Sequence, residues 1–383
     1  MIPYSKQSLD AEDRAAVAAV LEGDWLTQGP SVSSLERAFA ERCGVTHAVA
    51  FSSGTAALHA AAFAAGVGPG DEIATSAITF AASANCGAYL GARPRFADVE
   101  PETWNVSAAT LEPLVGPNTK LVVPVHFAGL PAPIESIREL VGPDVAIVED
   151  AAHALGGNAG GEEVGSCAAS EMTMFSLHPT KAITSCEGGV VTTRDPELAA
   201  RLTEFRQHGM VRERERLLHA GEWDGPWYHE QQHLGFNYRL SDVHAALGES
   251  QLGKLDDHVA RRNAVAARYR EALGGLAGLR LPPEPPPGAL HPYHLFVVHL
   301  AGGAPRRLAL YERLAANDIR AQVHYIPVYL HPFYRRTFGY APGLCPEAER
   351  YYAGCLSLPC YPDLSPTEQD RAIEVVREEM ARG

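Results

Sequence analysis

The chain has 383 residues, and its 46% hydrophobic and 20% charged residues are proportions typical of a packed globular protein. Its formal net charge of −14 argues against a nucleic-acid or anionic-membrane binder, because such binding needs concentrated Lys and Arg. The length accommodates one large domain with a smaller appendage, or two ordinary domains.

The cysteines and the N-terminal residues indicate a cytoplasmic protein. The seven cysteines are an odd number without a C-x-x-C pair, so we expect reduced thiols and not a disulfide framework. The N-terminal residues Met1-Ile-Pro-Tyr-Ser-Lys lack the basic stretch and apolar run of a signal peptide. The sequence also lacks the uninterrupted run of about eighteen apolar residues that a membrane span needs.

The first two thirds of the chain have the pattern of an α/β protein. An amphipathic helix is predicted over residues 9–22, before a loop that ends in Gly29-Pro. From about residue 31 to 250, apolar runs alternate with helical patterns, which predicts a mostly parallel sheet with helices on both faces. The predicted strands are His47–Ser52, Glu72–Thr75, Lys120–Val125, Val145–Glu149, Met172–Leu177 and Gly189–Thr193, and the predicted helices are 55–66, 80–90, 134–140 and 196–208.

The remainder of the chain is typical of a small α+β domain. A long helix capped by Ser241 or Asp242 is predicted from 242 to about 272, with a break near Gly253 or Asp257. We therefore predict a large domain over residues 1–250 and a small one over 251–383. Beyond the long helix come the stiff connector Pro282–Gly288, the strand-like His294–Leu300, a helix near 306–316, the segment Ala321–Val328 and a last helix near 366–381.

Two strand ends carry residues suited to a ligand. After Phe51, the small residues Ser-Ser-Gly-Thr lead into an Ala-rich helix, whose exposed N–H groups and hydroxyls suit a phosphate. Such joints are equally common without a ligand. Asp150 ends an apolar strand, at the edge of an open α/β sheet where ligands bind. Taken alone, Asp150 is better explained as a cap of the following helix.

Lys181 adds the decisive feature. It lies in a polar loop between two predicted buried strands, whereas most lysines lie on solvated helix faces. Desolvation there lowers the pKa of an amine, which favours imine formation. A phosphate cradle, a carboxylate at a strand end and a loop lysine, in this order, are the three contacts that pyridoxal 5′-phosphate (PLP) needs. Together they predict a PLP enzyme in which Lys181 forms the Schiff base and Asp150 keeps the pyridine nitrogen protonated.

Motifs along nearly the whole chain, roughly residues 2–380, resemble those of the sugar aminotransferases of the DegT/DnrJ/EryC1/StrS family. This resemblance implies PLP-dependent transferase fold type I, with a mostly parallel seven-stranded sheet in the large domain and a small C-terminal α+β domain. The motifs are Trp25-Leu-Thr-Gln-Gly-Pro, Ser52-Ser-Gly-Thr-Ala-Ala-Leu, Pro124-Val-His-Phe-Ala-Gly, Glu149-Asp-Ala-Ala-His, Ser176-Leu-His-Pro-Thr-Lys, Glu187-Gly-Gly, Arg206-Gln-His-Gly-Met and Gly235-Phe-Asn-Tyr-Arg-Leu-Ser-Asp.

The same resemblance implies roles for single residues. Lys181 matches the Schiff-base lysine, which favours transamination over the dehydration that relatives with His there perform, and Asp150 matches the partner of the pyridine nitrogen. The further cofactor contacts that it implies are the phosphate turn Gly54 and Thr55, the stacking Phe80, His153 at the ring hydroxyl, Ser176 at the phosphate, and Asn237 at the phosphate of the neighbouring subunit. The active site would then lie at the interface of a homodimer.

Two later segments, Ala321-Gln-Val-His-Tyr-Ile-Pro-Val-Tyr and Leu356-Ser-Leu-Pro-Cys, resemble one branch of the family, the 4-aminotransferases of pseudaminic acid biosynthesis. This branch implies transfer of an amino group from L-glutamate to C4 of a UDP-linked 4-keto-6-deoxy sugar. The substrate contacts that it implies are Thr27, Gly29, His324, Tyr325 and Tyr329.

Several alternatives stay open at this point. The acceptor is equally a different 3-keto or 4-keto nucleotide sugar, and a non-catalytic binding or regulatory subunit is a second class of function. His324-Tyr-Ile-Pro has the pattern of a packed strand end as well as of a substrate contact, and Gln28 and Arg206 are similar cases. Glu187 in Glu-Gly-Gly is explained by a structural role in orienting the lysine loop. The His291-Pro-Tyr-His and Cys355–Cys360 pairs lack metal-site spacing, so no metal is predicted.

Overall fold

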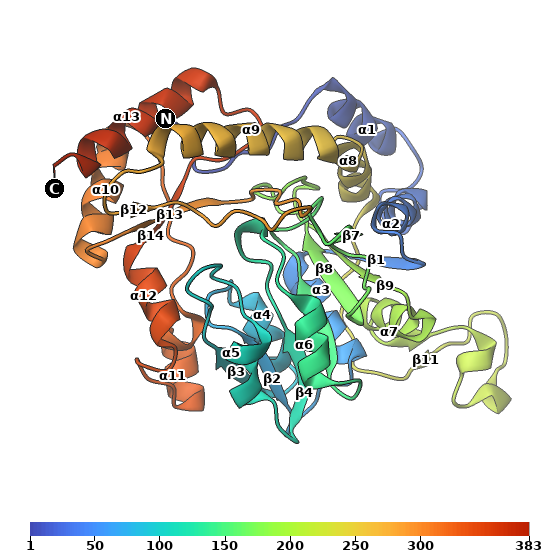
Figure 1. Ribbon diagram of the computed structural model, residues 1–383. Helices are drawn as coiled ribbons and strands as arrows, with labels where there is room; N and C mark the ends of the chain where they lie inside the picture. Colours follow the sequence, from blue (N-terminus) through green and yellow to red (C-terminus); the bar gives the residue numbers. More distant parts are fainter. Residues whose placement is uncertain (383) are drawn as a thin grey trace.

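The computed structural model describes residues 1–382 and has a seven-stranded sheet at its centre, in the strand order β1-β9-β8-β5-β4-β2-β3 (Figure 1). Strand β9 runs antiparallel to both of its neighbours, and the other neighbouring pairs are parallel. The mostly parallel sheet is thereby confirmed, and all six predicted runs belong to it. The strands are β1 (His47–Phe51), β2 (Glu72–Ser76), β3 (Arg93–Ala97), β4 (Thr119–Val123), β5 (Ala146–Asp150), β8 (Met172–Ser176) and β9 (Gly189–Thr193).

The seventh strand, β3, was absent from the prediction because its sequence Arg-Pro-Arg-Phe-Ala is not an apolar run. It lies at the sheet edge, where one side of the strand needs no hydrogen-bond partner and proline is tolerated. Its exposed positions carry charge: Arg95 Nη1 lies 2.8 Å from Glu72 Oε2 of the neighbouring strand.

Helices cover both faces of the sheet because successive strand residues alternate between two cores. Val49 and Phe51 of β1 face a core with α3, α4 and α7, whereas Ala50 faces a core with α2 and α8. In the other half of the sheet, Val122 and Ile147 face α5 and α6. The helices are α1 (Ala11–Leu21), α2 (Pro30–Cys43), α3 (Gly54–Ala64), α4 (Ala82–Ala88), α5 (Ala108–Leu111), α6 (Ile134–Val141), α7 (Pro196–Arg206) and α8 (Asp242–Leu252).

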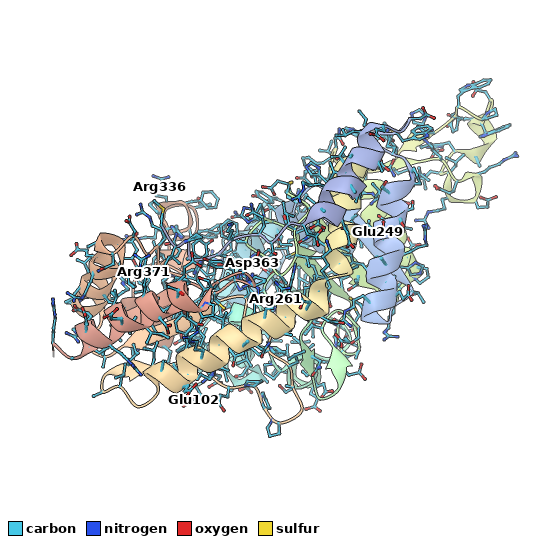
Figure 2. The ribbon with its side chains drawn as sticks, turned by 90° about the horizontal axis from the view of Figure 1, so that it is seen from above. Glu102, Glu249, Arg261, Arg336, Asp363 and Arg371 are labelled. Carbon is cyan, nitrogen blue, oxygen red and sulfur yellow. The ribbon has the colours of Figure 1, made fainter. Side chains whose placement is uncertain are left out.

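Helices α8 and α9 (Leu255–Leu273) replace the single long helix, with the break at Gly253 and Lys254 as predicted. The Ser241 hydroxyl caps α8 by accepting a hydrogen bond from the His244 N–H. Helix α9 runs across the molecule toward the C-terminal elements (Figure 1). Figure 2 shows Arg261 of α9 beside Asp363, and the two side chains form an ion pair of 3.2 Å.

The C-terminal elements form a second, smaller sheet covered by helices. Strands β12, β13 and β14 pair antiparallel, and helices α10 and α13 share their core. The segment 321–328 contributes one isolated bridge, Gln322 to Ser357, and no strand. The elements are β12 (Leu279–Arg280), β13 (Phe296–Leu300), β14 (Cys355–Leu358), α10 (Ala304–Ala316), α11 (Pro332–Phe338), α12 (Pro346–Gly354) and α13 (Pro366–Met380). The short strands β6 (Asn158–Ala159), β7 (Glu162–Glu163), β10 (Met210–Val211) and β11 (Glu230–Gln231) complete the fold.

The two parts of the chain are packed tightly against each other. Phe96 and Phe127 of the large sheet region share a core with Tyr329 and Tyr351 from the C-terminal part. The N-terminal Ile2 is buried in the C-terminal core and forms a bridge with Ile319. A domain boundary near residue 250 stays a prediction, since α9 joins both parts. In residues 1–382, no helix has both the length and the apolar character needed to cross a membrane.

Candidate active site

A cavity of about 710 Å³ lies at the carboxyl ends of the sheet strands. Its floor comes from the ends of β5 and β8 and from the start of α3, and its wall comes from the segment 322–326 of the C-terminal part. Carboxyl strand ends are where open α/β sheets bind ligands. Among the predicted residues, the cavity brings together Gly54, Thr55, Phe80, Asp150, His153, Ser176, Lys181, His324 and Tyr325, and Glu187 also lines it.

The start of α3 offers backbone donors to an anion. The Ser53 hydroxyl caps the helix by accepting a hydrogen bond from the Ala56 N–H at 3.1 Å, which leaves the N–H groups of Gly54 and Thr55 toward the cavity mouth. Gly54 packs closely on Ser176, because a Cβ atom at position 54 would lie 3.1 Å from the Ser176 Cβ. The turn is therefore narrow enough for its backbone and the Ser176 hydroxyl to face one small anion.

Lys181 is the only lysine that lines the cavity within the described chain. Burial lowers the pKa of its amine to about 8; the Asp150 carboxylate opposes this shift, and the buried Arg262 guanidinium adds to it. Arg262 also donates a hydrogen bond to the Lys181 carbonyl oxygen at 3.3 Å, which ties the lysine loop to α9. The amine is thus held in a position and a medium that favour its neutral, nucleophilic form.

The Asp150 carboxylate is buried and held from two sides. Oδ2 accepts a hydrogen bond from the Ser83 hydroxyl at 2.6 Å, and Oδ1 accepts one from the Ala152 N–H at 3.1 Å. Ser83 was not predicted from the sequence, because a serine in an Ala-rich helical segment carries no local sign of its partner. Its contact arises from the fold, which places α4 beside the end of β5.

A cluster of aromatic and imidazole side chains around His153 and Tyr325 forms another part of the cavity lining. The Tyr325 hydroxyl lies 3.2 Å from His153 Nε2, and the His294 ring packs against His153 with centroids 4.3 Å apart. Burial lowers the pKa of both imidazoles well below the ordinary value, so both are neutral at physiological pH. His153 Nδ1 is buried without a partner in the described chain, which leaves a polar atom for a ligand to satisfy. His294 was not predicted as part of the site.

Four of the predicted site residues lie outside the cavity. Thr27 bridges to Ser241, and the Gly29 N–H donates to Asp242 Oδ2 at 2.9 Å. Asn237 is exposed on the segment that bridges to Gln207. Tyr329 is fully buried, and its hydroxyl donates to Glu349 Oε1 at 2.5 Å, so it packs the core between the two parts. Arg206, one of the residues left open by the sequence, is also outside the cavity and forms an ion pair with Glu36 beside β1.

The chain is similar to known proteins along nearly its whole length. The model of the DegT/DnrJ/EryC1/StrS aminotransferase family matches residues 7–377. The chain belongs to this family. It is 38% identical over 381 residues to the spore coat polysaccharide biosynthesis protein SpsC of Bacillus subtilis, which covers 98% of this chain and 96% of that protein. The DegT/DnrJ/EryC1/StrS aminotransferases are PLP enzymes, so the PLP prediction is confirmed.

Solved aminotransferase structures share the whole fold. Helicobacter pylori PseC, an aminotransferase involved in the biosynthesis of pseudoaminic acid, is 30% identical with a TM-score of 0.90, and the match covers 100% of both chains. The putative sugar aminotransferase Spr1654 of Streptococcus pneumoniae, in its PMP form, is 25% identical with a TM-score of 0.91, and the match covers 100% of both chains. The predicted fold class, PLP fold type I, is thereby confirmed.

The residues of the cavity fit PLP. The phosphate needs backbone donors and a hydroxyl, which α3 and Ser176 offer; the aldehyde needs a neutral amine, which Lys181 offers. The pyridine nitrogen needs an ionised carboxylate, and Asp150 is already an acceptor of two hydrogen bonds. The unsatisfied His153 Nδ1 adds a further polar contact within the same cavity.

Proposed function

We propose that this protein is an aminotransferase that moves an amino group from L-glutamate to C4 of a UDP-linked 4-keto-6-deoxy sugar. The acceptor is of the UDP-2-acetamido-2,6-dideoxy-β-L-arabino-hex-4-ulose type, on the route to pseudaminic acid. The observation that carries the chemistry is one cavity containing the Lys181 amine, the Asp150 carboxylate and the start of α3. The choice of sugar is supported by the full-length match to PseC and by the His324-Tyr325 segment in the cavity wall.

The proposed mechanism assigns a task to each group of the cavity. PLP, when bound, supplies an aldehyde that condenses with amines and a ring that accepts electrons from the Cα–H bond. Lys181 Nζ would hold the cofactor and, as a free amine, would move the proton from the Cα of the amino donor. Its lowered pKa makes the free amine available as this base near pH 8.

The other residues act by binding and orientation. We assign Gly54, Thr55 and Ser176 to the phosphate, Phe80 to the cofactor ring face, and His153 to the ring hydroxyl. Asp150 would hold a proton on the pyridine nitrogen through whichever carboxylate lone pair faces the cavity. His324 and Tyr325 would contact the sugar, since they line the cavity from the C-terminal part of the chain.

The main alternative is the same reaction on another keto sugar. SpsC has the higher identity to this chain, 38% against 30% for PseC, and its name places it in spore coat polysaccharide biosynthesis. The fold match does not separate these substrates, because Spr1654 superposes as well as PseC does. A 3-keto or different 4-keto nucleotide sugar is therefore the second candidate. A non-catalytic binding or regulatory subunit is the third, and the complete set of PLP-binding groups disfavours it.

We also propose that the protein acts in the cytoplasm as a homodimer with shared active sites. All seven cysteines are unpaired and six of them are buried, which suits a reducing compartment. Asn237 lies outside its own cavity on an exposed segment, so it is free to reach the phosphate site of a second subunit. Leu234, three residues away, is 83% exposed, as expected of a side chain that a partner subunit covers.

A substrate panel tests the proposed function. Purified protein would be incubated with L-glutamate and a set of nucleotide-linked 4-keto and 3-keto hexoses, and the products identified by NMR. We expect a 4-amino product from the UDP-linked 4-keto-6-deoxy sugar and no turnover with Lys181→Ala. Product from a 3-keto sugar alone would select the second candidate. Failure of L-glutamate to bleach the visible band of bound PLP would favour the non-catalytic one.

A further inference from the structure

Ser83 in the first turn of α4 and Thr79 just before that helix present two hydroxyls in series to the Asp150 carboxylate. The Ser83 hydroxyl oxygen lies 2.6 Å from Asp150 Oδ2, and the Thr79 hydroxyl oxygen lies 2.6 Å from that of Ser83. Ser83 is fully buried and Thr79 is 2% exposed. Thr79 lines the cavity, whereas Ser83 does not line it and lies behind residues that do.

The proton count fixes the direction of these hydrogen bonds. A hydroxyl has one proton to donate, and Ser83 has three oxygens in reach: Asp150 Oδ2, Thr79 Oγ1 and the Phe80 carbonyl at 3.2 Å. The bond to the carboxylate is short and charge-assisted, so it takes the proton. Thr79 must then donate to Ser83. The series runs from Thr79 to Ser83 to Asp150.

This direction restricts what Asp150 can do. Oδ2 accepts a hydrogen bond from Ser83 and Oδ1 accepts one from the Ala152 N–H, so rotation of the carboxylate would break both. The two hydroxyls therefore oppose rotation of the acid.

We propose that Ser83, itself oriented by Thr79, is a positioning residue that fixes the orientation of the Asp150 carboxylate as an acceptor for the pyridine nitrogen of PLP. The inference rests on the proposed role of Asp150. It assigns the reactivity of the cofactor ring in part to a serine that never touches it. In Ser83→Ala, loss of the hydroxyl would leave both the Asp150 oxygen and the Thr79 hydroxyl without their partner in the buried site.

The experiment compares holoenzymes of the wild type, Ser83→Ala and Thr79→Val. We expect Ser83→Ala to lower the rate of the half-reaction with L-glutamate about 10- to 100-fold, as loss of an orienting partner of a site group commonly does, with little change in the KM for L-glutamate. Thr79→Val keeps the Ser83 donor and removes only the hydrogen bond that orients it. The rate of the half-reaction should therefore fall less in Thr79→Val than in Ser83→Ala.

The rate constant and the amplitude of the half-reaction together separate positioning from folding. A loss of folded or PLP-loaded protein would lower the amplitude, whereas loss of the Ser83 donor should lower the rate constant in the sites that hold PLP.

Ser250 provides a matched control. Its hydroxyl donates to Asp13 Oδ1, also at 2.6 Å, at the junction of α1 and α8 and outside the cavity. Ser250→Ala should lower the melting temperature yet leave the rate constant of the half-reaction unchanged. If Ser83→Ala behaved as Ser250→Ala does, the positioning role would be refuted.

Borohydride reduction distinguishes this failure from failure of the proposed function. Reduction of the wild-type holoenzyme, followed by peptide mass spectrometry, should find the PLP adduct on Lys181. Absence of that adduct would overturn the proposed function, and the inference with it. An adduct in the wild type together with wild-type kinetics in Ser83→Ala would overturn the inference alone.

Discussion

At the residue scale, Lys181 shows how burial prepares a reactive amine. Removal from water disfavours the charged ammonium and brings its pKa to about 8, although the Asp150 carboxylate favours that charge. The covalent capture of PLP needs the neutral amine. The rate of borohydride-trappable PLP uptake by apoprotein should therefore rise with pH between about 7 and 9 and level off above.

Asp150→Asn tests the electrostatic part of this balance. Because the carboxylate raises the pKa of Lys181, its removal should shift the uptake curve to lower pH. Stopped-flow absorbance would measure the curve for both proteins. A curve that stays in place, or one that shows no rise between pH 7 and 9, would contradict the assignment of Lys181 as a desolvated amine.

At Gly54, the absence of a side chain allows close packing against Ser176. A Cβ there would lie 3.1 Å from the Ser176 Cβ and 3.2 Å from its hydroxyl oxygen, so Gly54→Ala would push Ser176 away from the proposed phosphate site. We expect PLP to bind about 10-fold more weakly, roughly 1.4 kcal/mol, as measured by fluorescence titration. Gly68→Ala is the control, because a Cβ at position 68 meets nothing within 4 Å. Equal PLP affinity in both variants would exclude a tight turn at Gly54.

At the scale of elements, a buried acid fastens α1 to the junction of α8 and α9. Asp13 is 1% exposed and accepts hydrogen bonds from Ser250, Gln251 and Lys254. Asp13→Ala would remove the acceptor of Ser250 and one acceptor each of Gln251 and Lys254, and we expect a loss of about 2 kcal/mol in the free energy of unfolding in urea. Asp256→Ala, which removes an exposed ion pair with Arg42, should cost far less.

The same acid has a predictable pH dependence. Although burial opposes it, the hydrogen bonds from Ser250 and its neighbours lower the pKa of Asp13 below 3.8. A lowered folded-state pKa means that its stabilisation is present above the unfolded pKa and is lost as pH falls through the folded one. The stability gap between wild type and Asp13→Ala should therefore close in acid. A gap that is constant down to pH 2 would show that the ionised form is not what fastens α1.

Helices and strands were predictable where the spacing of apolar residues in the sequence matched their burial in the fold. They were not predictable where the place of a segment in the tertiary structure determined which residues it could contain. The apolar runs at Met172 and Gly189 became strands that are buried at nearly every position, as the strands of a sheet covered on both faces are. The strand at Pro94 escaped prediction because its edge position, which local sequence does not encode, permits Pro and Arg. In the site, Lys181 and Asp150 were found from their places at strand ends, whereas Ser83 was missed because its partner lies 67 residues away.

At the scale of the whole molecule, one arm departs from the compact body. The segment between β10 and β11 projects away from the sheet (Figure 1). Its side chains Leu218 and Trp227 are 72% and 70% exposed, which is unfavourable for a monomer. Leu234 and Asn237, which follow β11 in the chain, are also exposed. The proposed homodimer would bury these apolar side chains.

A complementation experiment tests whether two subunits share each site. Lys181→Ala and Asn237→Ala homodimers should both have little activity, because each lacks one contributor in every site. Mixed and re-associated, about half of the dimers would be heterodimers with one fully wild-type site each, so about a quarter of wild-type activity should return. Trp227→Glu should weaken the dimer in sedimentation equilibrium. Leu308→Glu, at a 54% exposed position of α10, should not. If mixing restores no activity although heterodimers form, the Asn237 contribution across the interface is wrong, and each subunit builds its site alone.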